Sequence, residues 1–130
     1  MTGRELGGQD LSAANRQGVL LAAQGAVAGA RVAYQRTIDS GDADAAPSAA
    51  GNLGVLLAGQ GDVAGARAAY QQAIDSGHAD AAPWAACNLG VLLAAQGDVA
   101  GARAAYQQAI DSGHAGAAPL AAANLANLPS

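Results

Sequence analysis

The spacing of apolar side chains in the last third of the chain predicts an amphipathic helix that begins near Val99. Apolar residues recur there on one face of a helix, which is the spacing that an α-helix with one buried stripe requires. Gly113 ends the pattern, because glycine commonly terminates helices. We therefore expect a helix over about residues 99–112. Its apolar stripe consists of Val99, Ala102, Tyr106, Ala109 and Ile110.

Another helix is predicted just before it, over residues 84–96. Pro83 suits the first turn of a helix, where its missing N–H costs nothing, and Gly97 suits the end. Asp98 follows as an N-cap, whose carboxylate accepts hydrogen bonds from the free N–H groups of the next helix. Because the link between the two helices is so short, we expect them to lie antiparallel.

The same helix pair is written three times along the chain. Residues 13–48, 49–84 and 85–120 align without a gap, and residues 121–130 begin a fourth copy. A period in the range of about 20–50 residues is typical of solenoids, in which each unit buries its core against the next. We therefore predict an all-α solenoid of antiparallel helix pairs, with a polar N-terminal segment (1–12), three repeats and a C-terminal capping helix. The phase is fixed by residues spaced 36 apart, namely Gly18, Gly54 and Gly90, and Asn52, Asn88 and Asn124.

Some positions carry further structural expectations. Gly90 lies inside a helix, where glycine costs about 1 kcal/mol relative to alanine, so we expect the second helix to cross close to it, with Ala102 as the opposing contact. Ala26 replaces the capping aspartate of the other copies, which should loosen the start of that helix by about 1 kcal/mol. Arg16 and Gln17 make the first copy more polar, as expected of a unit on which nothing stacks.

Composition narrows the possible functions. The chain is 52% hydrophobic but only 3% aromatic, and its net charge is −4. All six cations are arginines spread along the sequence, so we expect neither nucleic-acid nor anionic-membrane binding, which require clustered basic residues. With no hydrophobic signal segment and no apolar run near the length of about 18 residues needed to cross a membrane, the expected location is cytoplasmic. Abundant alanine and glycine without lysine or phenylalanine indicate a GC-rich bacterial genome.

Particular residues of the unit form a recognisable pattern. It reads Asn88-Leu89-Gly90, Leu93, Gln96-Gly97-Asp98, Ala102, Tyr106 and Ala109, and recurs as Asn52-Leu53-Gly54, Leu57, Gly61-Asp62, Ala66, Tyr70 and Ala73. Over residues 13–128 this pattern resembles the tetratricopeptide repeat. The period departs from the roughly 34 residues of that family, and the extra residues fall in the linker of the type 113–118. Gly113-His114-Ala115 stands where the family has proline, an ending similar to Sel1-like repeats.

The resemblance implies a right-handed helical solenoid that binds proteins or peptides, without a cofactor and without catalysis. In such proteins the first helix of each unit lines a concave groove. Residues at 100° steps place Trp84, Cys87 and Val91 on the corresponding face, opposite the side that packs within the unit. We therefore expect a weakly charged, apolar peptide-binding groove. Its candidate residues are Ser48, Gly51, Asn52, Val55, Ala58, Gly59, Trp84, Cys87, Asn88, Val91, Ala94, Ala95, Leu120 and Asn124.

Copies two and three differ at only four places, three of them on this groove face. The differences pair Gly51 with Cys87, Gly59 with Ala95, Asp80 with Gly116, and Trp84 with Leu120. One interpretation is that a fixed scaffold carries a drifting recognition surface, with Trp84 as its aromatic anchor. The other is that recent duplicates differ at random and that Trp84 fills space between adjacent units. The lysines of a carboxylate clamp, as used by family members that grip C-terminal tails, are absent.

Catalytic and metal chemistry are not expected. Asp42, His78 and His114 occupy equivalent linker positions on successive units, which lie on the order of 10 Å apart, too far to ligate one ion. We expect the histidine rings to meet free carbonyls at helix C-termini. Cys87, the single cysteine, has no activating partner at helical spacing, and no intramolecular disulfide can form.

Two functions remain open from the sequence. The first is a protein-interaction scaffold that binds a peptide or protein segment in its groove. The alternative is a self-assembling or engineered repeat protein without a separate ligand, a homo-oligomer formed through terminal helices. The partial repeat 121–130 favours this alternative, because a first helix without its second exposes apolar surface.

Overall fold

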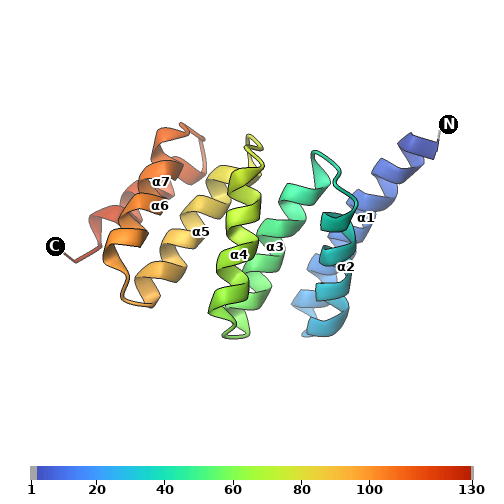
Figure 1. Ribbon diagram of the computed structural model, residues 1–130, viewed down its shortest axis with the longest axis horizontal. Helices are drawn as coiled ribbons and strands as arrows, with labels where there is room; N and C mark the ends of the chain where they lie inside the picture. Colours follow the sequence, from blue (N-terminus) through green and yellow to red (C-terminus); the bar gives the residue numbers. More distant parts are fainter. Residues whose placement is uncertain (1–2, 130) are drawn as a thin grey trace.

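The protein is a row of helical hairpins (Figure 1). The computed structural model describes residues 3–129, and the side chains of residues 13–129. All regular secondary structure in residues 3–129 is α-helical, which confirms the predicted fold class. The helices are α1 (Gly3–Ala23), α2 (Val27–Asp39), α3 (Ala45–Gly59), α4 (Val63–Asp75), α5 (Ala81–Ala95), α6 (Val99–Asp111) and α7 (Ala117–Ala126).

The helices follow the repeat of the sequence. Helices α1–α2, α3–α4 and α5–α6 are three antiparallel pairs, and α7 is a further first helix. The repeat boundaries at residues 49 and 85 fall one turn inside α3 and α5, because these helices begin at Ala45 and Ala81. Residues 3–12 of the predicted polar segment continue α1, while residues 1, 2 and 130 lie outside the described residues.

The helices form two layers that differ in how closely they are packed. Each helix contacts its neighbours in sequence, and the first helices α1, α3, α5 and α7 also contact one another in succession. Within the described part of the chain, the second helices α2, α4 and α6 make no comparable contacts among themselves. A row whose first helices touch while its second helices are spread apart bends toward the first helices. The outward-facing side of the first-helix layer is therefore the inner face of the curve.

The short turn within each unit follows the predicted residue pattern. At the end of α5, Gly97 has a φ of 82°, a left-handed conformation that glycine adopts without steric cost. The N–H of Gly97 donates to the carbonyl of Ala94 (3.0 Å), and the N–H of Asp98 donates to that of Leu93 (2.9 Å). The Asp98 carboxylate then accepts from the N–H of Gly101 at 2.9 Å. One aspartate thus ends α5 and caps α6.

The equivalent position in the first unit lacks this cap. Ala26 precedes α2 and makes no side-chain cap hydrogen bond, whereas Asp62 caps α4 through the N–H of Gly65. The predictions of caps at Asp62 and Asp98, and of an uncapped start at Ala26, are confirmed.

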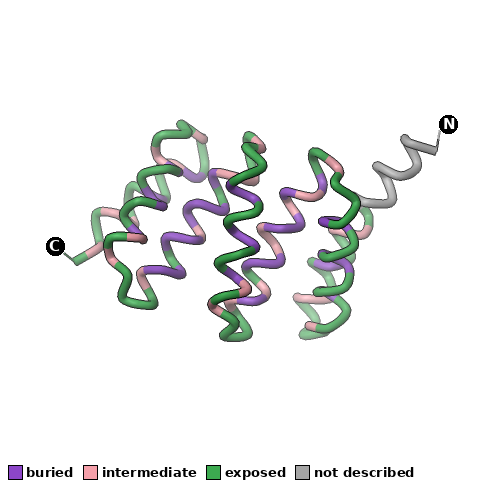
Figure 2. Tube along the Cα trace, in the orientation of Figure 1, coloured by how far each residue is buried: buried purple, intermediate pink, exposed green. Residues whose placement is uncertain are grey.

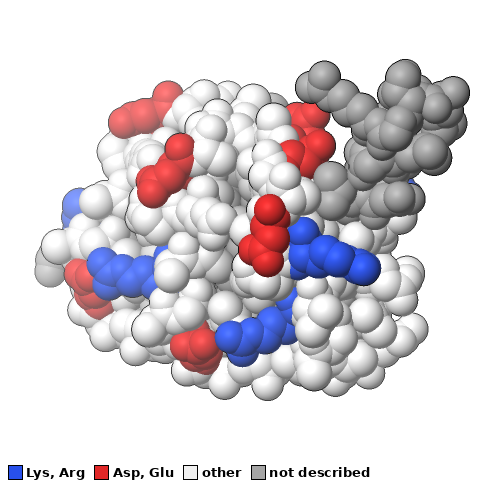
Figure 3. Space-filling view, turned by 45° about the vertical axis from the view of Figure 1, so that its right-hand side comes forward, with Lys and Arg blue, Asp and Glu red and all other residues white. Residues whose placement is uncertain are grey.

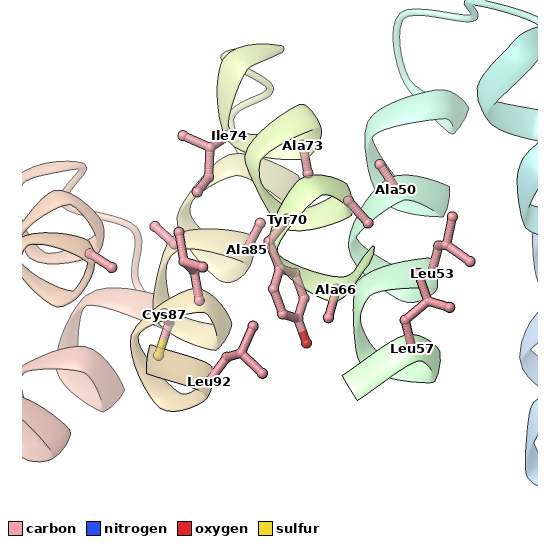
Figure 4. Packing of buried hydrophobic residues seen from close by; sticks show 14 of the residues in the cluster. Ala50, Leu53, Leu57, Ala66, Tyr70, Ala73, Ile74, Ala85, Cys87 and Leu92 are labelled. Carbon is pink, nitrogen blue, oxygen red and sulfur yellow. The ribbon is translucent and has the colours of Figure 1, made fainter. Parts of the chain in front are cut away.

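The buried residues form one continuous core along the row, on the facing sides of the two layers (Figure 2). Most of its members are alanines and leucines, and one tyrosine per unit supplies the largest side chain. Figure 4 shows Tyr70 reaching from α4 into this core near Ala66 and Leu92. The three equivalent tyrosines, Tyr34, Tyr70 and Tyr106, are each 3% exposed, as predicted for core residues.

The glycine inside each first helix makes room for this tyrosine. A Cβ atom added to Gly90 would lie 2.4 Å from Cε1 of Tyr106, and one added to Gly54 would lie 2.4 Å from Cε1 of Tyr70. The expected close approach at Gly90 is confirmed. The expectation that Ala102 opposes it is wrong, because the ring of Tyr106, one turn further along α6, occupies that space.

Candidate functional site

The inner face of the first-helix layer exposes large apolar side chains in register with the repeat. Val19, Val55 and Val91 lie at equivalent positions of α1, α3 and α5, and they are 47%, 53% and 49% exposed. Trp84 on α5 and Leu120 on α7, which are also equivalent, are 39% and 46% exposed. Val19 was missed from the sequence, although it lies 36 residues before Val55 and could have been found by extending the groove pattern to the first copy.

The predicted groove residues separate into three groups by burial. The exposed ones lie along the outward stripe of each first helix, the half-buried ones lie at its edges, and one is fully buried. The exposed residues are Val55, Gly59, Trp84, Val91, Ala95 and Leu120. The half-buried residues are Ser48, Gly51, Asn52, Ala58, Asn88, Ala94 and Asn124, of which Ala58 and Ala94 pack against the core.

Cys87 does not lie on the exposed face, contrary to the prediction. Its side chain is fully buried on the side of α5 that faces α7 (Figure 4). Burial raises the pKa of the thiol, and a hydrogen bond with the side chain of Asn124 opposes this rise in part. The helical wheel of one unit could not predict that Cys87 is buried, because the helix that covers it belongs to the next unit. A buried thiol with a raised pKa is a poor nucleophile.

Asn52, Asn88 and Asn124 form a row of equivalent, half-buried asparagines along the first helices. The amide nitrogen of Asn52 donates to Oδ1 of Asn15 on α1 at 3.2 Å. The side chain of Asn124 lies near the Cys87 thiol on α5 and lowers its pKa. Asn15 and Cys87 occupy equivalent positions in the first and third units. The equivalent residue of the second unit is Gly51.

A cleft of about 290 Å³ opens between α3 and α5, where this glycine faces Asn88. One wall is apolar and is formed by Val55 and Trp84, and the rim carries Ser48 and the carboxylate of Asp80. Its volume lies just below the range of about 300–1,000 Å³ of small-molecule sites. The cleft is therefore suited to a single side chain of a partner.

Trp84 both packs between units and remains accessible. Its ring meets that of His114 edge-on, with the centroids 5.6 Å apart and the planes at 69°. A Cβ atom added to Gly116 would lie 2.7 Å from Cζ2 of the indole. In the preceding unit the equivalent residues are Ser48 and Asp80. Two of the four differences between copies are therefore coupled, because the large Trp84 requires the small Gly116.

The linker histidines cap the helix that follows them. Nδ1 of His114 accepts from the N–H groups of Gly116 (3.1 Å) and Ala117 (3.0 Å) at the start of α7. His78 caps α5 in the same way. The expectation that these rings meet free carbonyls is wrong, since the ring turns toward the next helix and its nitrogen serves as an acceptor.

The other nitrogen of each ring reaches back to the preceding unit. Since Nδ1 is an acceptor, Nε2 carries the proton, and Nε2 of His114 lies 2.9 Å from Oδ1 of Asp80. Nε2 of His78 lies 3.4 Å from Oδ1 of Asp44. Each histidine thus ties two consecutive units together at the rim of the inner face. Asp42 takes the capping role before α3, and two backbone N–H groups hold the pKa of its carboxyl below the usual range.

The charges on the surface are few and mixed. In the view of Figure 3 the arginines and the acidic residues are interspersed, without a basic patch. Within the described residues, no group of three His, Cys, Asp or Glu side chains is arranged to hold a metal ion. None of the helices that the structure describes is both long enough and apolar enough to cross a membrane.

Stacked helix pairs, a glycine at each helix crossing and a shared core along the row define a helical-repeat protein. The family model described as the tetratricopeptide repeat matches residues 33–83 and 52–122, more than half of the chain. The chain belongs to the tetratricopeptide repeat family. Repeats of this family are generally scaffolds for protein–protein interactions rather than enzymes. The matched model does not specify the Sel1-like features, and no curated protein matches the chain.

Proposed function

We propose that this protein is an interaction scaffold that binds an extended protein segment along the inner face of α3, α5 and α7. The observation that carries the proposal is the row of exposed apolar side chains on that face, in particular Val55, Trp84 and Val91. Apolar side chains that line up across three helices form a continuous patch, and such patches commonly mark protein-binding surfaces. A large aromatic residue near the centre is a common source of binding energy in such interfaces.

The polar groups of the inner face indicate the charge of the partner. Asp44 and Asp80 lie at its rim, and the chain contains no lysine. A partner segment rich in carboxylates would be repelled there. The proposed ligand is therefore a neutral or weakly basic segment with apolar side chains, and not a C-terminal acidic tail.

Selection from a displayed library of random peptides tests this function. The affinity of the selected peptides is measured with the native protein, with Val91→Ser and with Val32→Ser. Val32 is 67% exposed but lies on α2, in the other layer, so it provides a matched control. Losing the burial of one valine is expected to weaken binding by about tenfold or more for Val91→Ser, and Val32→Ser should bind like the native protein.

Emission from Trp84, the single tryptophan, provides an independent signal, since a peptide seated beside it should change its spectrum. Equal binding by the native protein and Val91→Ser, together with unchanged Trp84 emission, would contradict the proposed site.

The self-assembling alternative is favoured by one observation, the 46% exposure of Leu120 on α7. However, the last turn of α7 and the residues that follow it cover part of this end. Leu125 and Leu128 pack against the core, and the Arg103 guanidinium donates to the carbonyl of Pro129 at 3.5 Å. Sedimentation at increasing concentration distinguishes the alternatives. A dimer that dissociates in Leu120→Ser would support self-assembly, and a monomer at high concentration would reject it.

A further inference from the structure

At the cleft between α3 and α5, the first helix supplies no side chain at a position that carries one in the neighbouring units. Position 15 on α1 is asparagine, and its side chain accepts a hydrogen bond from Asn52 of the following unit. Position 87 on α5 is cysteine, and its thiol lies close enough to Asn124 of the following unit for that side chain to lower its pKa. Gly51 is the equivalent residue of α3. A Cβ atom added there would meet nothing within 4 Å. At this place the α3–α5 interface therefore has no side chain from the first of its two helices, whereas Asn15 and Cys87 supply one at the interfaces on either side. A cleft of about 360 Å³ also opens between α1 and α3, beside Asn15 and Arg16.

The group left without its counterpart is the side-chain amide of Asn88. Asn52 donates to Asn15 on the preceding first helix, whereas no hydrogen bond joins Asn88 to another side chain within residues 13–129. Asn88 is half-buried and lines the cleft together with Gly51 and Trp84. A half-buried amide without a protein partner hydrogen-bonds to water. A ligand group that replaces this water forms a stronger hydrogen bond, because the ligand also excludes solvent from the cleft.

The neighbouring interface shows which chemistry fits opposite this amide. At the equivalent place between α1 and α3, the contact is a bond between two carboxamides, those of Asn15 and Asn52. A carboxamide can both donate to and accept from Asn88, so it matches either orientation of that amide. The carboxylate of Asp80 lies on the same rim and disfavours an acidic side chain. Asp80 is already engaged by His114 at 2.9 Å, which makes it less available to a cationic one.

We propose that this cleft is a specificity pocket for an asparagine or glutamine side chain of the bound protein segment. The carboxamide hydrogen-bonds to Asn88 in the space above Gly51, and its methylene groups lie against Trp84 and Val55. The pocket rests on the proposed function, because it supplies one side-chain site within the peptide-binding face. The α3–α5 interface then selects one residue of the partner.

The test fills the cleft with the protein's own side chain. Gly51→Asn reproduces the residue found at position 15, and the open space at this glycine allows the variant to fold. Ala68→Asn places the same side chain on the exposed side of α4 and serves as the matched control. Circular dichroism verifies the helix content of both. Asn88→Ala removes the amide while leaving the cleft open.

Peptides selected by display on the native protein are expected to share an asparagine or glutamine at one position. A selected peptide should bind about tenfold more weakly to Gly51→Asn and to Asn88→Ala, and equally well to Ala68→Asn. Replacing its carboxamide residue by glutamate or leucine should weaken binding to the native protein by a similar factor. The same replacement should have little effect on binding to Gly51→Asn, in which the pocket is already occupied.

The outcomes separate the pocket from the groove. If peptides bind in a manner that depends on Val91 but show no carboxamide preference, or bind Gly51→Asn as tightly as the native protein, the pocket is wrong and the groove stands. If no selected peptide depends on Val91, both proposals fail.

Discussion

Replacing Gly90 by alanine is expected to destabilise the protein, although alanine is the better helix former. The added Cβ would lie 2.4 Å from Cε1 and 2.5 Å from Cδ1 of Tyr106, closer than carbon atoms approach in folded proteins. The ring is 3% exposed and surrounded by the core, so it can move only by displacing its neighbours. The close-packed interior therefore resists the methyl group.

The magnitude follows from two opposing terms. Alanine in place of glycine inside a helix contributes about 1 kcal/mol of stability. Overpacking a filled core costs about 1–3 kcal/mol, and the short contact with an aromatic ring places this substitution at the upper end. The expected net loss for Gly90→Ala is about 2 kcal/mol. Gly51→Ala is the matched control, because its Cβ meets nothing within 4 Å, and it should gain about 1 kcal/mol.

Urea unfolding, followed by circular dichroism and by Trp84 emission, measures both variants. The difference between them, about 3 kcal/mol, isolates the steric term because the helix-propensity gain is common to both. Combining Gly90→Ala with Tyr106→Leu should recover part of the loss, since the two substitutions act on one contact. Equal stabilities of Gly90→Ala and Gly51→Ala would show that the glycine is not required by the tyrosine ring.

Three further predictions concern the caps and the thiol. Asp98→Ala should lower the free energy of unfolding by about 1 kcal/mol through the lost hydrogen bond to Gly101, and Ala26→Asp should raise it by a similar amount. Urea unfolding measures both variants, and midpoints equal to that of the native protein would contradict the capping role. The pKa of the Cys87 thiol is raised by burial, so its labelling by a thiol reagent at mildly alkaline pH should be slow in the native protein and fast in urea, and fast labelling without urea would show that the side chain is accessible. The pKa of Asp42 is lowered from its usual 3.8, so the stability that this carboxylate contributes is present above that value and is lost as the pH falls through the lower folded-state pKa. The difference in unfolding free energy between the native protein and Asp42→Ala should therefore shrink on acidification from about pH 5 to about pH 2. A difference that stays constant with pH would contradict this role.

The sequence predicted the helices because their limits are set by local chemistry. Gly97 and Asp98 end one helix and begin the next through contacts within a few residues, and such contacts can be inferred without a structure. The period then implied that each unit stacks on the next. The same pattern of Asn, Gly and Tyr positions carried the resemblance to tetratricopeptide repeats.

What the sequence did not predict depends on how one unit meets another. Cys87 was placed on the exposed face because its own helix allows that orientation, and only the position of α7 shows that it is buried. The partner of Gly90 was misassigned because the rotation of α6 about its axis decides between Ala102 and Tyr106. The capping role of His78 depends on the path of the linker. These contacts are set by tertiary packing, which one repeat read alone does not contain.

The pairing of Trp84 with Gly116 restricts how the gene could lengthen. A tandem duplication of residues 49–84 would leave the reading frame and the period intact, yet it would set Trp84 opposite a second copy of Asp80. Even a single Cβ at that place would lie 2.7 Å from the indole, so an aspartate there would displace the Trp84 ring from its position between the units. The near-identical units are therefore not interchangeable. Their order along the chain is constrained by the packing of each unit against the next.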